Sequence, residues 1–439
     1  MLTIFLRNKM FFGLMILVFI LLGTNINQPF WGHHEWNGVF YSNIARNYLR
    51  YGFIKTKFGE VINYGVVNSE NFHFHTQHPV LFPILLAIFF KIFGIGEWQA
   101  RLLPIIFSLA SLYIFNLILK KIYNFSLTYL PVILGIITPL FLYYARMPVY
   151  EPIIGFFILL TVYFYWLWRN NPQKLTFIIV CLSLLICQMI EWPGYYLGLT
   201  LFLHLFLFPV KTKSRLRGLW WLILSLASFS LVVIHQYLLT GEVRGALFNI
   251  FMKRMGEGTS QPFTLWQFIR LEIARARSFL TTPLLALAFY WFIVYLIKII
   301  RQQKISPQEH FSIFFLFFGV LHIIIFPNVA WYHDYMWYYF FFPLLLAVSI
   351  ALKNIFSKAK QFKFLVFLVI LLLVFLEKRK FFIDLKKLNP HFKCVKWGKE
   401  IKTGLKPSVI ELDSEEDAKI CPPFTNYYAD QEVEFKLKK

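Results

Sequence analysis

Two glutamates of this chain lie beside apolar runs, in segments whose other residues could take part in catalysis. Glu35 lies in Trp31-Gly-His-His-Glu-Trp-Asn-Gly, directly after the first apolar run, and Glu151 lies in Arg146-Met-Pro-Val-Tyr-Glu-Pro, just before a later one. A carboxylate held between aromatic residues is partly desolvated, so its pKa can be tuned for taking a proton from a hydroxyl group. We therefore predict Glu35 and Glu151 to be catalytic carboxylates.

Polar residues near these acids, and in the late segment Asn328-Val-Ala-Trp-Tyr-His-Asp-Tyr, can bind a sugar or a phosphate. Arg146 shares a turn with Glu151 and can neutralise that acid or hold a phosphate. Simpler interpretations stay open, because a helix dipole favours an acid at Glu151 and an interfacial belt explains many of the late aromatic residues. The residues predicted to bind substrate are His33, His34, Asn37, Arg46, His78, Arg146, Glu191, His333, Asp334 and Tyr335.

Histidine is concentrated in one part of the chain. Five of the eleven histidines, His33, His34, His73, His75 and His78, fall between the first apolar run and residue 100. Imidazole and carboxylate groups are the usual ligands of divalent metals. Their spacing matches no known zinc pattern, and polar aromatic residues are common at a membrane interface. A divalent metal is therefore an open alternative, and the sequence requires no cofactor.

The elements that must position these residues are apolar helices. The chain has 439 residues, of which 58% are hydrophobic and 20% aromatic, and its mean hydropathy is +0.59. Because about 20 apolar residues cross a bilayer as a helix, about eleven runs predict an all-α polytopic membrane protein. These runs lie near 10–25, 101–119, 125–143, 152–168, 175–189, 194–209, 218–238, 282–299, 311–326, 337–352 and 363–376.

The formal charge of +22 is a feature of nucleic-acid binders, but its placement excludes that function. Basic residues such as Lys120, Arg169, Lys298 and Lys353 occupy every second short connection, as the positive-inside rule requires. We read the first run as an uncleaved signal anchor with a cytoplasmic N-terminus. An odd number of spans then puts the C-terminus, and the predicted site residues, outside the cytoplasm.

Two segments outside the spans carry helical patterns. In the external segment 26–100, Phe40, Ile44 and Tyr48 recur at helical spacing and predict a helix lying in the interface. Val80 to Phe93 is apolar but short, which favours a juxtamembrane helix. The second external segment, 239–281, has an amphipathic pattern near its end and predicts another interfacial helix.

The composition becomes polar from residue 377. We predict a membrane domain over 1–376 and a small extracytoplasmic α/β unit over 377–439. Ser408-Val-Ile-Glu-Leu and Glu432-Val-Glu-Phe have the pattern of short strands, with the Cys-Pro-Pro between them as a turn. Cys394 and Cys421 lie in this unit, where an oxidising compartment permits a disulfide without establishing one.

Taken in order, these segments resemble the membrane glycosyltransferases of the C superfamily (GT-C). The resemblance is to the family that includes protein O-mannosyltransferases and the aminoarabinose transferase of lipid A. It covers about residues 30–350. The segments that carry it are the acidic motif at Glu35, Ser-Asn-Ile-Ala-Arg-Asn-Tyr-Leu, His-Pro-Val-Leu-Phe-Pro, Phe-Gly-Ile-Gly-Glu-Trp-Gln-Ala-Arg-Leu-Leu-Pro, Arg-Met-Pro-Val-Tyr-Glu-Pro and the late His-Asp-Tyr.

The resemblance implies a polyprenyl-phosphate sugar donor, presented on the outer face of the membrane, and a lipid, glycan or protein acceptor. It implies that Glu35 is the base, that Glu151 positions a substrate and that Arg146 binds the phosphate. The family often has Asp at or beside the first position, where this chain has Glu35 and Asn37. A single displacement by the activated hydroxyl would invert the anomeric centre.

Two other functions remain compatible with these patterns. A polytopic transporter or lipid flippase would also carry buried charges, but usually near the bilayer midplane and within repeats. An inactive family member that serves as an assembly partner would tolerate the loss of both carboxylates. The clustering of charge at one membrane face favours the enzyme.

Overall fold

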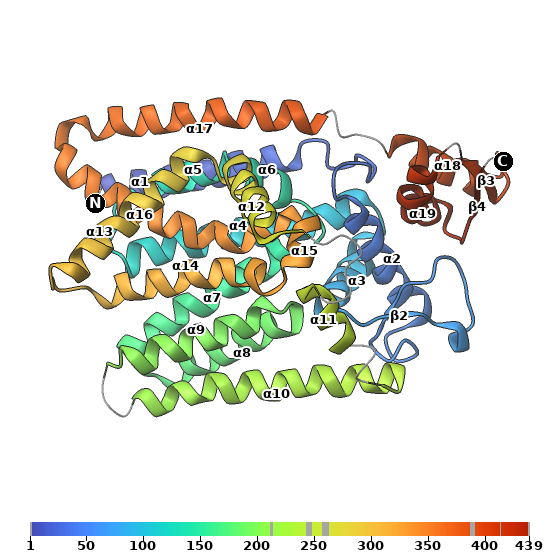
Figure 1. Ribbon diagram of the computed structural model, residues 1–439, viewed down its shortest axis with the longest axis horizontal. Coiled ribbons are helices and arrows are strands. Elements are labelled where there is room, and N and C mark those ends of the chain that lie inside the picture. The colour runs from blue at the N-terminus through green and yellow to red at the C-terminus, as the bar shows by residue number, and fades with distance from the viewer. Residues whose placement is uncertain are drawn as a thin grey trace.

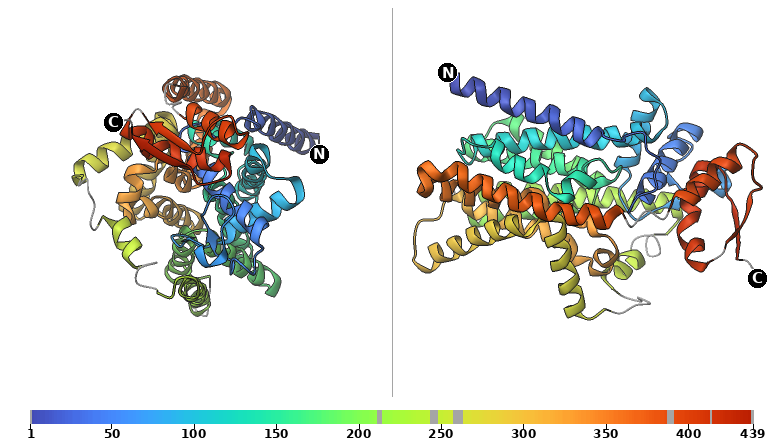
Figure 2. Two further views of the ribbon diagram at one scale, coloured as in Figure 1. Left: turned by 90° about the vertical axis from the view of Figure 1, so that its right-hand side faces the viewer. Right: turned by 90° about the horizontal axis from the view of Figure 1, so that it is seen from above.

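This computed structural model describes residues 2–210, 214–242, 248–256, 263–386, 391–412 and 414–437. Long helices lie side by side along the molecule, with two small sheets beyond one end of the bundle (Figure 1). The N-terminus lies at the opposite end of the bundle from the C-terminus, as the view from above also shows (Figure 2). The predicted mainly helical architecture is confirmed.

Among the long helices of the bundle, α7 packs on α8 and α4, α9 packs on α10, and α16 packs on α13 and α14. Among the described residues, six helices are long and apolar enough to cross a membrane, and four more apolar helices are shorter. The chain is thus an integral membrane protein. The bundle comprises α1 (Leu2–Gly23), α4 (Glu97–Lys121), α7 (Tyr150–Asn170), α8 (Lys174–Ile190), α9 (Pro193–Leu207), α10 (Ser214–Thr240), α13 (Thr282–Ile300), α14 (Pro307–Ile325), α16 (Tyr338–Ala359) and α17 (Lys363–Lys386).

The predicted run 125–143 is not one continuous helix. It forms α5 (Tyr129–Ile136) and α6 (Pro139–Tyr144), which are separated at Thr138. Thr138 adopts an extended conformation, and its side chain accepts a hydrogen bond from the backbone N–H of Phe141. Proline at the next position has no N–H to continue the preceding helix, but it suits the first turn of a new one.

Shorter elements cover the end of the bundle that carries the predicted site residues. The segments predicted as interfacial helices form α2 (Trp36–Tyr51) and α12 (Leu265–Leu280), and the segment predicted as a juxtamembrane helix forms α3. Residues 243–247 and 257–262 of the second external segment lie outside the described residues. The other short elements are α3 (Leu81–Phe93), α11 (Asn249–Met255), α15 (Pro327–Tyr332), η1 (Ser69–Asn71), η3 (Asp334–Trp337), η4 (Lys360–Phe362) and the antiparallel strands β1 (Glu60–Val61) and β2 (Phe74–His75).

The C-terminal unit consists of α18 (Phe392–Lys402), β3 (Val409–Leu412), α19 (Glu415–Ala429) and β4 (Glu434–Leu437). Strands β3 and β4 are parallel, so a crossover must join them, and α19 is that crossover. The predicted Cys-Pro-Pro turn is wrong, because Pro422 and Pro423 lie inside α19. The buried side chains of α19, including Phe424 and Tyr427, show that tertiary packing outweighs the low helix propensity of proline here.

Charged contacts join the C-terminal unit to α2. Asp430 pairs with Arg46 and Arg50 at 2.8 and 2.7 Å. These contacts hold the pKa of the Asp430 carboxyl below its usual range, although partial burial opposes the shift. The Tyr428 hydroxyl also accepts a hydrogen bond from the backbone N–H of Phe30. Arg46, predicted to bind substrate, instead connects α2 to this unit.

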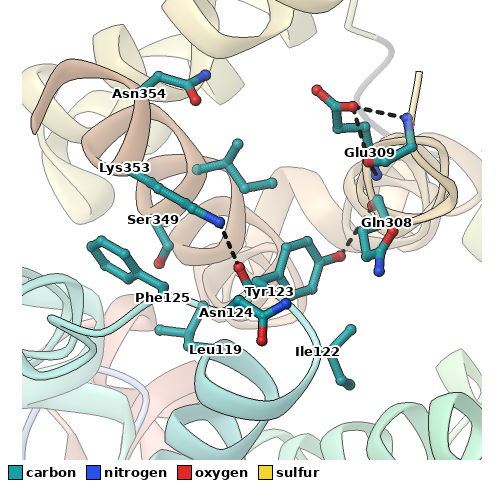
Figure 3. Close-up of a pocket in the computed structure, with 12 residues that line it drawn as sticks. Leu119, Ile122, Tyr123, Asn124, Phe125, Gln308, Glu309, Ser349, Lys353 and Asn354 are labelled. Atoms are coloured by element: carbon teal, nitrogen blue, oxygen red, sulfur yellow. Dashed lines mark hydrogen bonds between the residues drawn. The ribbon is translucent and has the colours of Figure 1, made fainter. Parts of the chain in front are cut away.

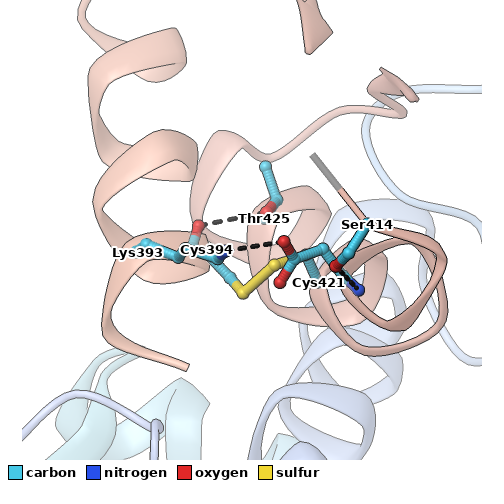
Figure 4. Close-up of a disulfide and its surroundings, with 6 residues drawn as sticks. Lys393, Cys394, Ser414, Cys421 and Thr425 are labelled. Carbon is cyan, nitrogen blue, oxygen red and sulfur yellow. Dashed lines mark hydrogen bonds and ion pairs between the residues drawn. A yellow bond between two sulfur atoms is a disulfide. The ribbon is translucent and has the colours of Figure 1, made fainter. Parts of the chain in front are cut away.

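A disulfide joins Cys394 of α18 to Cys421 of α19, and the Thr425 hydroxyl donates to the carbonyl of Cys394 (Figure 4). The bond closes a loop with a sequence separation of 27, so Cys421→Ser should destabilise the C-terminal unit by about 3 kcal/mol. Limited proteolysis of the protein in liposomes should show faster cleavage within this unit. Cys181→Ser, which removes a free thiol in α8, is the matched control. Equal cleavage of both variants would contradict the prediction.

Candidate functional site

A polar cavity of about 540 Å³ lies at the end of the bundle that α2 covers. Its wall combines the first external segment, the starts of α7 and α16, and the short helices α11 and α15. Five separate parts of the chain, within 36–78, 149–151, 250–254 and 322–339 and at Glu191, therefore supply polar side chains to one space. The lining residues are Trp36, Asn37, Phe40, Tyr41, His75, Gln77, His78, Val149, Tyr150, Glu151, Glu191, Ile250, Lys253, Arg254, His322, Asn328, Val329, Tyr332, His333, Tyr335, Met336 and Tyr339.

Two buried carboxylates line this cavity. Glu151 lies in the first turn of α7 and is 3% exposed, and Glu191 follows α8 and is 1% exposed. One oxygen of Glu151 accepts a hydrogen bond from the Tyr339 hydroxyl at 3.1 Å, whereas its Oε2 has no partner among the described residues. A buried carboxylate oxygen without a donor is costly, so Glu151 is suited to accept a proton.

A chain of hydrogen bonds runs from Arg254 through His78 to Glu191. Arg254 Nη2 lies 2.8 Å from His78 Nε2, and His78 Nδ1 lies 2.6 Å from Glu191 Oε2. A guanidinium can only donate, so Nε2 must accept and Nδ1–H must donate to Glu191. Burial and the charge of Arg254 hold the pKa of His78 well below its usual range, and burial raises the pKa of Glu191. His78 is therefore neutral and held in one orientation.

An apolar cavity of about 590 Å³ adjoins the polar one. The two share Gln77, Ile250 and Arg254, so the guanidinium of Arg254 lies where a polar space meets an apolar one. Such a junction suits an amphiphile with an anionic group beside a hydrocarbon chain. The remaining residues that line the apolar cavity are Trp192, Tyr195, Tyr196, Phe229, Val233, Phe248, Phe251 and Phe326.

Glu35 does not line the polar cavity. Its carboxylate pairs with Arg101 at 2.7 Å and accepts hydrogen bonds from the backbone N–H groups of Trp31 and Gly32. Arg101 is 1% exposed and also donates to the carbonyls of Ile26 and Gln28. Glu35 therefore connects the start of the external segment to α4.

Glu35→Gln should lower stability, because it leaves the buried Arg101 without its counter-charge. Removing one partner of a buried ion pair typically costs about 3–5 kcal/mol. A thermal-unfolding assay in detergent should therefore show a clearly lower Tm. Glu70→Gln, at an exposed acid of the same external segment, is the control. An unchanged Tm for Glu35→Gln would show that the pair is dispensable.

The structure brings most of the predicted binding residues together. Asn37, His78, Glu191, His333 and Tyr335 line the polar cavity. The adjoining His33, His34 and Asp334 contact one another directly. Arg46 contacts Asp430, as described above.

Arg146 lies outside the cavity, where it donates to the backbone carbonyls of Thr24 and Asn25. Burial and the nearby charge of Arg101 lower its pKa to about 10. Those hydrogen bonds hold the end of α1 against the segment that precedes α7.

Sequence reasoning missed Arg254 and Lys253, the cations of the polar cavity. They lie on α11 in the second external segment, where the adjacent pair of basic residues after an apolar stretch was a usable signal. It also missed the hydrogen bond between His75 Nδ1 and the fully buried Glu60 Oε2, at 2.6 Å. Burial raises the pKa of Glu60.

Another cavity, of about 230 Å³, lies at the opposite end of the bundle (Figure 3). There, Lys353 donates to the carbonyl of Tyr123, and the Tyr123 hydroxyl donates to that of Gln308. Glu309 pairs with Lys298 at 2.5 Å and caps the start of α14. These polar groups bind one another, so this cavity offers less to a substrate than the first.

Residues 77–236 match the family model described as dolichyl-phosphate-mannose-protein mannosyltransferase. This region begins beside His78 and includes Glu151 and Glu191. No curated protein sequence matches the chain.

The fold is similar to crystal structures of ArnT from Cupriavidus metallidurans in the apo state and bound to undecaprenyl phosphate. Each comparison has a TM-score of 0.61 at 10% sequence identity, and covers 97% of this chain and 85% of the other. The family model matches one part of the chain and the structures share its fold, which agrees with the resemblance to C-superfamily membrane glycosyltransferases.

Proposed function

We propose that this chain, a membrane protein of the GT-C type, transfers a sugar from a polyprenyl-phosphate donor to an acceptor outside the cytoplasm. The observation that carries the proposal is the junction at Arg254, where a polar cavity with two carboxylates meets an apolar cavity. A sugar and an acceptor hydroxyl fit the polar space, and an isoprenoid chain fits the apolar one. The ArnT structure with undecaprenyl phosphate supports this class of donor.

In this proposal the phosphate of the donor binds to Arg254, where the polar and apolar cavities meet. Arg254 can form paired hydrogen bonds with phosphate oxygens, and Lys253 on the same helix adds a second positive charge. His78 and Glu191 keep the guanidinium in place through the hydrogen bonds given above. The positive charge stabilises the polyprenyl phosphate as it leaves.

Glu151 is the proposed general base. Its unpartnered oxygen takes the proton of the acceptor hydroxyl, and the hydroxyl oxygen then attacks the anomeric carbon of the sugar. The bond between that carbon and the phosphate oxygen breaks, and its electron pair leaves with the polyprenyl phosphate. This single displacement inverts the anomeric centre.

Glu35 is proposed as a positioning residue. It acts through Arg101 and the backbone of residues 31 and 32, which precede Trp36 and Asn37 in the cavity wall. The segment predicted as the catalytic acid motif therefore contributes to the shape of the site. The role of carboxylate base, which the sequence predicted for Glu35, is assigned to Glu151 in this proposal.

The proposal keeps the predicted topology. The N-terminus is cytoplasmic, and the polar cavity, the second external segment and the unit predicted over 377–439 face outward. The bundle predicted over 1–376 performs catalysis. A cysteine-accessibility experiment with Cys at Ser69, in the external segment, tests this orientation. Labelling by a membrane-impermeant reagent in intact cells supports the proposal, and labelling only after lysis contradicts it.

Release of polyprenyl phosphate from polyprenyl-phosphate sugars tests the function itself. The protein is reconstituted in liposomes with a panel of such donors and an envelope extract that supplies acceptors. Donor-dependent release supports sugar transfer. A flippase or solute transporter would move its substrate without releasing the carrier.

A further inference from the structure

Three potential metal ligands come together beside the polar cavity, from parts of the chain about 300 residues apart. His33 Nε2 lies 2.9 Å from Asp334 Oδ2, and His34 Nε2 lies 3.2 Å from Asp334 Oδ1. One ligand atom of each residue lies within 4.8 Å of those of the other two. Ligand atoms about 2 Å from a common metal ion would be separated by a little more than 3 Å. Small side-chain adjustments would therefore suffice for all three to bind one ion.

The surrounding structure holds these ligands in place before any ion binds. The Tyr143 hydroxyl donates to the backbone carbonyl of His33 at 2.7 Å, and the Asn37 amide donates to that of His34 at 3.0 Å. The Tyr144 hydroxyl donates to Asp334 Oδ1 at 2.5 Å. Hydrogen bonds to a ligating carboxylate are the usual outer partners of a metal site.

The backbone of His34 has an unusual conformation. Its φ is 56°, in the left-handed region that residues with a Cβ rarely adopt. In this conformation the side chains of two consecutive residues both reach Asp334, and their ring centroids lie 4.0 Å apart. Consecutive residues of an extended strand would point to opposite sides.

We propose that His33, His34 and Asp334 bind a zinc ion. Two imidazoles and one carboxylate form a zinc ligand set, which leaves a fourth position for water. The His33 side chain is 29% exposed and gives the ion access from solvent. The site needs none of the residues assigned to donor binding or proton transfer.

The ion would fix one wall of the polar cavity. The ring of His34 packs against Tyr335 and His333, at centroid distances of 5.2 and 5.9 Å, and both of those residues line the cavity. Zinc would therefore link the first external segment to the segment that leads into α16. We expect the bound ion to raise stability and to order this wall.

Metal content of the full-length protein tests the site. The protein is purified through a tag without histidine, stripped with a chelator and equilibrated with micromolar zinc chloride before elemental analysis. The wild type should retain about one zinc per chain, and zinc should raise its Tm by several degrees. X-ray absorption should show nitrogen and oxygen ligands, at about 2.0–2.1 Å for imidazole nitrogen.

The variants are chosen to preserve the local structure. His34→Asn retains a residue that tolerates the left-handed conformation, and Asp334→Asn has nearly the same shape as the native side chain. Both should lower zinc affinity at least about tenfold and abolish the zinc-dependent change in Tm. Tyr144→Phe leaves all three ligands and should weaken binding by about tenfold.

His73→Asn is the matched control, because His73 is exposed in the same external segment and lies outside the cluster. It should bind zinc like the wild type. A wild type that retains no zinc at micromolar concentration overturns the proposal. So does equal zinc retention by the wild type, His34→Asn and Asp334→Asn. Either result leaves the release assay for sugar transfer unaffected, so the two proposals fail independently.

Discussion

Glu151→Gln is expected to lower kcat for sugar transfer by about 10²–10⁴-fold, the range for loss of a general base. The amide retains the size of the side chain and can still accept a hydrogen bond from Tyr339, which lies 3.1 Å away in the native structure. It cannot accept the proton of the acceptor. KM for the donor should change little, because Arg254 and the apolar cavity are unaltered. Initial rates of polyprenyl phosphate release in liposomes measure both constants.

Glu70→Gln is the control for this experiment. Glu70 is an exposed acid in the first external segment and does not line the cavity. The same chemical change there should leave kcat and KM unaltered. If Glu151→Gln retains wild-type kcat while Glu35→Gln loses it, the base is Glu35 and the assignment made from the structure is wrong.

Arg254→Gln is expected to raise KM for the donor by about 10–100-fold, because a charge-assisted hydrogen bond contributes about 1.5–3 kcal/mol. It should also lower kcat, since the same charge stabilises the leaving phosphate. The measurement is release rate as a function of donor concentration. Binding of polyprenyl phosphate alone should weaken in parallel, because the contact is with the phosphate.

Arg146→Gln is the matched comparison. The sequence predicted Arg146 to bind phosphate, whereas in the structure it donates to the carbonyls of Thr24 and Asn25. We expect this variant to alter stability more than donor KM. A large increase in KM for Arg146→Gln, with none for Arg254→Gln, would restore the prediction made from the sequence.

The sequence predicted the helical bundle well, because the length and composition of an apolar run are local properties. The charge pattern of the connections also predicted that Glu151, Glu191 and His78 lie at one end of the bundle. In the structure all three line the polar cavity. When a chain crosses the membrane repeatedly, its helices end at only two membrane faces. Residues at alternate helix ends therefore have a good chance of lying close together. This holds whichever helices are neighbours in the bundle.

The roles of individual charged residues depend on contacts that no local pattern contains. Glu35 pairs with Arg101, and Arg46 pairs with Asp430, which is 384 positions away. Glu35 and Arg46 are charged residues in segments that resemble a binding site. Their ion-pair partners show that they stabilise the fold. Arg254 was missed for the converse reason, because the basic charge of the chain was assigned to topology as a whole.

Proline led to two opposite errors in the secondary structure predicted from the sequence. Pro139 divides the predicted run 125–143 into two helices, because Thr138 takes the extended conformation of an N-cap. Pro422 and Pro423 lie within α19, where a turn was predicted. Proline signals a break only where the surrounding packing does not hold the chain in a helix.

The central claim is most directly tested by carrier release from reconstituted protein, comparing the wild type with Glu151→Gln across the panel of polyprenyl-phosphate sugars. The account predicts release of free polyprenyl phosphate from at least one donor, together with glycosylated acceptor, and its loss in Glu151→Gln. The absence of release from every donor, alongside movement of lipid or solute that Glu151→Gln leaves unchanged, would contradict the account and favour a transporter.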